Sequence, residues 1–245
     1  MGCVVPSFSP NSSWFDAAQS QNIQYLFQNT AACAGLTDTR TKPGSYFGWT
    51  ALHYAILADN EEIFKLLLPL ERNLSTKERA VVQFQDQLIR IPSGSSPVHL
   101  ILYFNRVNLL SICIDFMCED IRIQHDLCQC RDSAGYSPLL YCPVLDNEAC
   151  AIWARNKDAL KTELRISDIR GENFLFKVVQ QNKTEYISLV IDILTEQKLI
   201  NIEITNNKLK ETMRDLLKPN KLTNKNWRDE TTFEIIQMIE NAAKV

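Results

Sequence analysis

The sequence predicts an all-α fold, an α-solenoid of helix-turn-helix repeats with capping units. The first observation behind this prediction is a four-residue phrase that recurs, each time beginning two residues after a glycine. Its copies are Thr50-Ala51-Leu52-His53, Ser96-Pro97-Val98-His99, Ser137-Pro138-Leu139-Leu140 and Asn173-Phe174-Leu175-Phe176. The second observation is an apolar pattern that begins thirteen residues after the first residue of each copy. Such self-similarity is typical of arrays in which each unit buries its apolar face against its neighbours.

Each unit is predicted to form a helix, a short turn and a second helix, because its apolar residues recur at spacings of three and four. In the first full unit the apolar pattern of the second helix begins at Ile63, and the equivalent residues of the later units are Leu109, Cys150 and Tyr186. A leading unit, visible from Trp14 to Thr30, shows the same pattern in a shorter form.

The connections between the units are unequal in length. The phrase recurs after 46, 41 and 36 residues, and the helix pairs align without gaps. The extra residues must therefore lie between the helices of successive pairs. The largest insertion spans about residues 73–92 and contains an alternating apolar run from Val81 to Ile91. A long hairpin and an extended second helix would both fit this run.

The phrase resembles the ankyrin signature Thr-Pro-Leu-His-x-Ala, closely in the first copy and weakly in the fourth. The ankyrin period is about 33 residues, so the chain resembles an ankyrin array with long insertions. In that family the signature histidine bonds to the Thr or Ser three residues before it. The resemblance therefore implies that His53 pairs with Thr50 and His99 with Ser96, whereas the third unit carries Leu140 at this position.

The resemblance divides the chain into an array and two terminal segments. Residues 1–11 are predicted to be a disordered leader, in which Met1-Gly2-Cys3 leaves N-terminal acylation open. The array covers residues 12–200, and residues 201–245 form a C-terminal helical cap that closes its apolar end. The units of the array lie near residues 12–40, 44–92, 93–131, 132–167 and 168–200.

A concave protein-binding face is a further implication of the resemblance. In ankyrin arrays the exposed positions of this face include the residue before the signature and two residues near the end of the first helix. The partner-binding residues expected here are Tyr46, Phe47, Trp49, Leu57, Tyr103, Phe104, Tyr136, Val144 and Leu145. Two alternatives remain open, because the inserted segments could fold over these residues and the same face could mediate homodimerisation.

Composition argues against several classes of protein. The 245 residues carry a net charge of −3 and no stretch approaches the length of a membrane span. We expect no nucleic-acid surface, since such surfaces cluster Lys and Arg on one face, and the Lys-rich stretch 208–225 fits a solvated helix face and linker. No secretory signal is evident, so a cytoplasmic location is expected.

The eight cysteines fit reduced thiols. The register places Cys113, Cys142 and Cys150 in the core. A second group is clustered in the sequence and consists of Cys118, His125, Cys128 and Cys130. Free thiols in a connecting loop, a zinc site and a redox pair are all compatible with this group, although structural zinc sites usually show pairs of the form Cys-x2–4-Cys.

Together these features predict a non-catalytic protein–protein interaction module: an adaptor, scaffold or inhibitor with no cofactor. Degenerate repeats with long insertions are compatible with an effector of an intracellular microbe, in which case the host-cell cytosol would be its location. No nucleophile–base pair is visible, so an enzyme is not expected. The alternative is an enzyme-associated or metal-binding protein with a site in the Cys118–Cys130 cluster or the C-terminal region.

Overall fold

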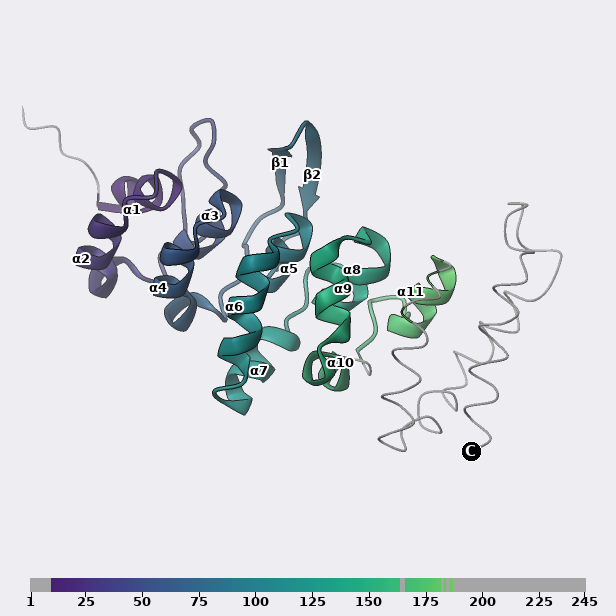
Figure 1. Ribbon diagram of the computed structural model, residues 1–245. Coiled ribbons are helices and arrows are strands. Elements are labelled where there is room, and N and C mark those ends of the chain that lie inside the picture. Colours follow the sequence, from purple (N-terminus) through teal and green to yellow (C-terminus); the bar gives the residue numbers. More distant parts are fainter. Residues whose placement is uncertain (1–9, 164–165, 182, 184–185, 187–245) are drawn as a thin grey trace, which may run out of the picture.

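The computed structural model describes residues 10–163, 166–181, 183 and 186. These residues form a row of helix pairs in which each pair packs against the next (Figure 1). The predicted fold class, an all-α ankyrin-type solenoid, is confirmed. Helix α1 begins at Pro10, so the helical part starts two residues earlier than expected. The rest of the predicted leader, the second helix of the last unit and the C-terminal cap lie outside the described residues.

Four helix pairs and the first helix of another follow the predicted order. The pairs are α1 (Pro10–Gln19) with α2 (Ile23–Cys33), α3 (Ala51–Ala58) with α4 (Glu61–Glu71), α5 (Pro97–Tyr103) with α6 (Val107–Met117), and α8 (Pro138–Leu145) with α9 (Glu148–Arg155), and α11 (Phe174–Gln180) starts the next unit. Two short helices were not anticipated, α7 (Ile121–Cys128) and α10 (Lys157–Glu163). They follow α6 and α9 at the end of the units away from the strands, and α7 supplies much of the extra length of the 41-residue step (Figure 1).

The turns inside the helix pairs share one backbone feature. One residue in each turn adopts a positive φ, which lets the chain reverse direction within a few residues; these residues are Gln21, Asp59, Asn105 and Asp146. An asparagine follows in three of the turns and its side-chain oxygen accepts an N–H of the second helix; these residues are Asn22, Asn60 and Asn147. Such caps satisfy a backbone donor that the helix itself leaves unpaired.

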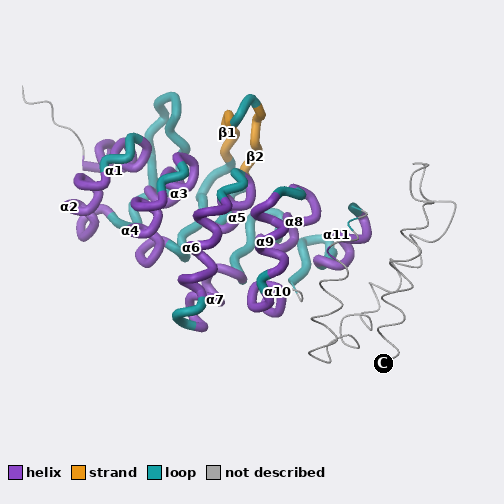
Figure 2. The backbone as a smooth tube through the Cα atoms, viewed as in Figure 1, coloured by secondary structure: helices purple, strands orange, loops and turns teal. Residues whose placement is uncertain are grey.

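The segment that joins one unit to the next first helix is called a finger here. Each finger is closed at its foot by two backbone hydrogen bonds. The first residue of the finger accepts the N–H of a glycine and donates its own N–H to the carbonyl of the residue after that glycine. The first residue, the glycine and the following residue are Asp38, Gly48 and Trp49; Thr76, Gly94 and Ser95; Asp132, Gly135 and Tyr136; and Asp168, Gly171 and Glu172. Fingers 3 (residues 132–135) and 4 (168–171) are short. Fingers 1 (38–48) and 2 (76–94) are long and project on the same side of the array (Figure 2).

Finger 2 contains the predicted hairpin, so the hairpin interpretation is correct and the extended helix is wrong. Strands β1 (Ala80–Phe84) and β2 (Gln87–Ile91) pair antiparallel, with Val81 opposite Arg90 and Gln83 opposite Leu88. Gln85 and Asp86 both have positive φ, as a two-residue hairpin turn requires. Among the described elements, β1 and β2 are the strands and all the others are helices.

Neighbouring fingers also touch each other through their backbones. The N–H of Ile169 in finger 4 donates to the carbonyl of Ala134 in finger 3 at 3.3 Å. Gly135 lies at this contact with φ +77°, and a Cβ there would lie 2.9 Å from the Ile169 nitrogen. Gly135→Ala is therefore expected to lower the free energy of unfolding by about 1–3 kcal/mol, measured by urea denaturation.

Gly44→Ala is the matched control for this prediction. Gly44 has φ +79°, but nothing lies within 4 Å of a Cβ built there. This variant carries the conformational strain without the steric contact, so it should cost less than Gly135→Ala. Equal losses in the two variants would show that the close approach of the two fingers adds nothing.

Candidate functional site

The nine residues predicted to bind a partner lie in finger 1, directly after fingers 1 and 3, and near the ends of α3, α5 and α8. This surface, together with the outer part of finger 2, is called the finger face here. Phe47 and Val144 are exposed, with 49% and 48% of their surface accessible. Five others are half-buried: Tyr46, Leu57, Tyr103, Tyr136 and Leu145. The predicted binding role of these seven residues stays a prediction.

Trp49 was expected to be exposed, and this expectation is wrong, because its exposed fraction is 0%. Its indole ring lies 4.4 Å from the ring of Tyr46 and 5.5 Å from that of Tyr54, between ring centroids, and meets His53 edge-on. The long finger 1 closes at Trp49 through the bond from the Asp38 N–H, so the finger itself covers the indole.

Phe104 was also expected to be exposed, and this expectation is wrong, because its exposed fraction is 1%. Phe84 of the hairpin packs against it at a centroid distance of 5.1 Å, and the Arg106 guanidinium lies 4.8 Å above the Phe84 ring. Arg106 also donates to the carbonyls of Ile56 and Leu57 at the end of α3. The inserted hairpin therefore covers part of the predicted face, which was the alternative left open by the sequence.

Buried acids tie the fingers to the first helices. The hydroxyl of Tyr54 donates to Asp38 at 2.5 Å, and the hydroxyl of Tyr141 donates to Asp132 at the equivalent position. Burial raises the pKa of both tyrosines, so they stay protonated and donate.

The last finger repeats this arrangement with a different donor. The Lys177 ammonium lies 3.1 Å from Asp168 and 4.8 Å from the centre of the Tyr136 ring. Tyr54, Tyr141 and Lys177 each stand four residues after the start of the recurring phrase, a regularity that the sequence analysis missed. The bonds make the foot of each of these fingers a firmly held platform.

The signature histidines act as structural groups, as the resemblance implied. The backbone N–H of Thr50 donates to Nδ1 of His53 at 3.0 Å, and the N–H of Ser96 donates to Nδ1 of His99 at 3.1 Å. Because Nδ1 accepts, the proton of the neutral ring sits on Nε2, and in His99 this atom lies 3.0 Å from the carbonyl of Tyr136, directly after finger 3. Burial lowers the pKa of His53 to about 3 and of His99 to about 4, so both rings are neutral at pH 7.

Two buried glutamates hold the starts of first helices. Glu71, at the end of α4, accepts the N–H of Leu52 at 2.8 Å, and Glu163, at the end of α10, accepts the N–H of Leu139 at 2.7 Å. Leu52 and Leu139 occupy equivalent positions in the first turns of α3 and α8, where backbone N–H groups lack helical partners. Burial raises the pKa of both carboxyl groups, in Glu163 to about 8. No spacing in the sequence indicated this role.

The Cys/His cluster does not converge on one point. Cys128 is buried, Cys130 is half-buried with its thiol donating to the Asp126 carbonyl, and Cys118 and His125 are exposed. Across residues 10–163 and 166–181, no group of three or more His, Cys, Asp or Glu side chains is arranged to hold a metal ion. Cys113, Cys142 and Cys150 are fully buried, which confirms their predicted place in the core.

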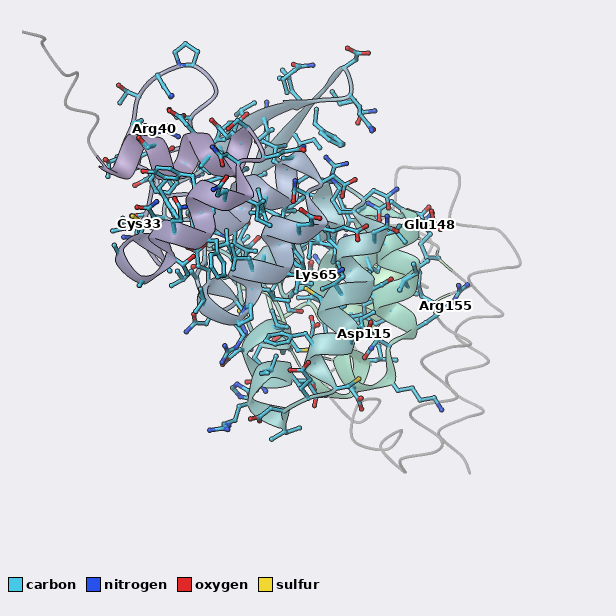
Figure 3. The ribbon with its side chains drawn as sticks, turned by 60° about the vertical axis from the view of Figure 1, so that its left-hand side comes forward. Cys33, Arg40, Lys65, Asp115, Glu148 and Arg155 are labelled. Atoms are coloured by element: carbon cyan, nitrogen blue, oxygen red, sulfur yellow. The ribbon has the colours of Figure 1, made fainter. Side chains whose placement is uncertain are left out.

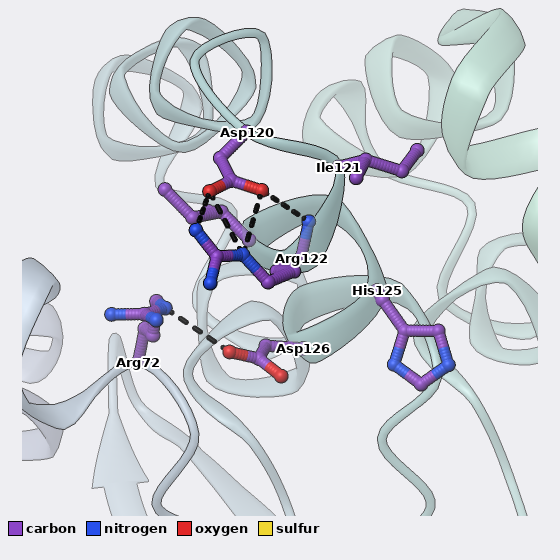
Figure 4. Close-up of a pocket in the computed structure, with 7 residues that line it drawn as sticks. Arg72, Asp120, Ile121, Arg122, His125 and Asp126 are labelled. Carbon is purple, nitrogen blue, oxygen red and sulfur yellow. Dashed lines mark hydrogen bonds and ion pairs between the residues drawn. The ribbon is translucent and has the colours of Figure 1, made fainter.

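An open depression of about 680 Å³ lies beside α7 (Figure 4). Helix α7 itself lies at the end of the units away from the strands (Figure 1). Its guanidinium groups are already paired, because Arg72 contacts Asp126 at 3.2 Å and Arg122 contacts Asp120 at 2.7 Å. The exposed Ile121 forms part of its rim. The depression therefore presents paired charges rather than free ones, and the finger face remains the candidate site.

Comparison with known proteins is consistent with this architecture. The family model for the ankyrin repeat matches residues 47–75, which contain α3 and α4. Among solved structures the chain is similar to an ankyrin repeat protein from Leishmania major, with a TM-score of 0.45 and 9% sequence identity over 96% of this chain and 99% of that chain. No curated protein matches the sequence. The family match shows an ankyrin repeat at residues 47–75, and the helix pairs that repeat on either side of it make the described part of this chain an ankyrin-type solenoid.

Proposed function

We propose that this chain is a non-catalytic adaptor, scaffold or inhibitor that binds a partner protein on its finger face. Ankyrin repeats are in general protein-interaction modules, typically without catalytic activity. The observation that carries the proposal is that fingers 1 and 2, the two long fingers, project on the side where Phe47 is exposed. Fingers 1 and 2 are longer than fingers 3 and 4, whereas the helix pairs keep the same arrangement.

The geometry of the finger face supports this role. Leu57, Tyr103 and Val144 occupy the same position in three successive units, so stacking sets them side by side. The second-helix side is different in character: exposed Lys65 of α4, Asp115 of α6, and Glu148 and Arg155 of α9 are charged (Figure 3). Apolar and aromatic anchors favour protein interfaces, whereas interspersed charges are typical of a solvated surface.

The cellular setting of this function stays a prediction. An intracellular adaptor and an effector of an intracellular microbe that acts in the host-cell cytosol would use the same finger face. Within the described ranges, no helix combines the length and the apolar character that crossing a membrane requires. The proposal depends on the finger face alone and not on the compartment.

The proposal is tested by altering the two exposed anchors together, Phe47→Ser and Val144→Ser. Truncating an anchor at the centre of an interface typically costs about 2 kcal/mol, or about thirtyfold in affinity. We expect the double variant to lose the main partner recovered by crosslinking and mass spectrometry with the full chain. Both side chains are exposed, so the melting temperature should change little.

Ile121→Ser is the control, because Ile121 is also apolar and is even more exposed, but lies on α7. It should retain the partner. Equal recovery by wild type and by the Phe47/Val144 variant would contradict the proposal. Sedimentation of the same proteins tests whether the partner is a second copy of this chain. In that case wild type and Ile121→Ser would be dimers, and the Phe47/Val144 variant would be a monomer.

A further inference from the structure

The geometry points to the outward face of the β1–β2 hairpin as the docking surface for an acidic, amphipathic segment of a partner protein. This inference rests on the proposed function and specifies the chemistry of the partner. It uses residues of finger 2 that the sequence analysis did not select. The inference depends on two exposed aliphatic side chains, Val81 and Leu88. They lie beside the exposed Arg79 and Arg90, which form no ion pair with any described residue.

The inner face of the hairpin fixes its position. Val82 and Ile91 are buried, and Phe84 lies between the Phe104 ring and the Arg106 guanidinium. This packing holds the strands against the array at the end of α5. The outward side chains are therefore not needed to attach the hairpin, and their apolar character calls for another explanation.

The outward face carries apolar residues where polar ones are the rule. In antiparallel pairs with one solvated face, the residues that point to water are commonly polar. Val81 is 57% exposed and Leu88 is 69% exposed, and neither packs against the core. Val81 pairs with Arg90 and Leu88 with Gln83, so the two aliphatic residues are diagonal neighbours on the same face. Diagonal neighbours are about 7–8 Å apart, close enough for one partner segment to cover both.

The charges around this apolar pair select an acidic partner. Arg90 lies directly across from Val81, and Arg79 is exposed two residues before Val81. Neither guanidinium makes an ion pair within the described residues. The acids of finger 2 stand elsewhere, Glu78 at its foot and Asp86 in the turn. Although the whole chain has a net charge of −3, this face therefore presents two guanidinium groups that no described residue neutralises.

A partner segment must match both features. Residues two apart in a strand are about 7 Å apart, so an extended segment with an acid two positions from an aliphatic residue reaches Arg79 and Val81 at the same time. The aliphatic contacts would supply most of the affinity, and the carboxylate–guanidinium contacts would select the acidic sequence and its direction. Rising salt should weaken binding, because these charges are exposed.

The test is a random-peptide display selection against the full chain, followed by titration of the selected peptides. We expect the enriched peptides to combine Asp or Glu with aliphatic residues. Their affinity should fall by about tenfold or more for Val81→Ser/Leu88→Ser and for Arg79→Glu/Arg90→Glu, a loss of about 1.4 kcal/mol in each case. The control for charge, Lys65→Glu/Arg155→Glu on the second-helix side, and the control for apolarity, Ile121→Ser, should bind as wild type.

Several results would overturn the inference. These are enrichment of no peptide, enrichment of peptides without acidic residues, and unchanged affinity for either hairpin variant. Peptides that are lost only with Phe47→Ser/Val144→Ser would uphold the proposed function while overturning this inference. A further experiment uses phosphatidylserine vesicles. If no peptide binds, but the full chain sediments with the vesicles and the hairpin variants do not, the surface binds a membrane and not a protein segment.

Discussion

Trp49→Ala is expected to lower the free energy of unfolding by about 3–5 kcal/mol, the range observed when a buried aromatic side chain is truncated to alanine. Trp49 is fully buried under finger 1 and contacts the rings of Tyr46, His53 and Tyr54. The loss would be a large part of the stability of a typical domain.

Denaturant titration of Trp49→Ala beside Trp49→Phe tests this expectation. The indole nitrogen has no hydrogen-bond partner among the described residues, so phenylalanine removes no polar contact and keeps most of the packing. Trp49→Phe should therefore cost much less than Trp49→Ala. Near-normal stability of Trp49→Ala would show that the residue faces solvent. Loss of partner capture in this variant would report unfolding rather than a lost anchor.

The contribution of Glu163 to stability is expected to fall as pH rises from about 5 to 8. Burial is the main factor that raises the pKa of this carboxyl from 4.5 to about 8, and contacts with Ser137, Leu139 and Trp153 oppose it. Between these two values the folded protein holds a proton that the unfolded chain has released. The contribution of this group to stability then decreases with rising pH, by roughly 1 kcal/mol per pH unit at the centre of the window.

Glu163→Gln isolates this contribution, because glutamine does not titrate and retains an oxygen that can accept an N–H. Chemical denaturation of both proteins at several pH values gives the difference in unfolding free energy. The advantage of the glutamine variant should grow from about pH 5 to pH 8 and level off above it. A constant difference across this range would contradict a raised pKa in the folded state, and Glu148→Gln, an exposed residue of α9, serves as the neutral reference.

The array was predictable because its determinants are local. The phrase from Thr50 to His53 encodes the start of a helix through its own hydrogen bonds, and the alternation from Val81 to Ile91 encodes strand pairing. Each pattern acts within about a dozen residues, so it is visible without knowing the rest of the chain. The burial of Cys113 followed from the same periodicity.

The surface was less predictable because it depends on contacts between distant segments. Trp49 and Phe104 stand at positions that are exposed in ordinary ankyrin units, and both are covered by fingers longer than the family norm. The role of Glu163 depends on α10, a helix whose presence changes which groups reach the start of α8. Length added to a connection is visible in a sequence, but the side chain that it covers is not.

The two backbone bonds at the foot of every finger make the segment between them a closed loop whose length is nearly free to vary. The entropic cost of closing a flexible loop rises only with the logarithm of its length, by about 0.6 kcal/mol for each doubling. If finger 3 (residues 132–135) were as long as finger 2 (residues 76–94), its length would have doubled a little more than twice. The entropic cost of closing it would then rise by roughly 1 kcal/mol. The array can therefore acquire or exchange a projecting element at a small thermodynamic cost, and without any change to the stacking of its helices.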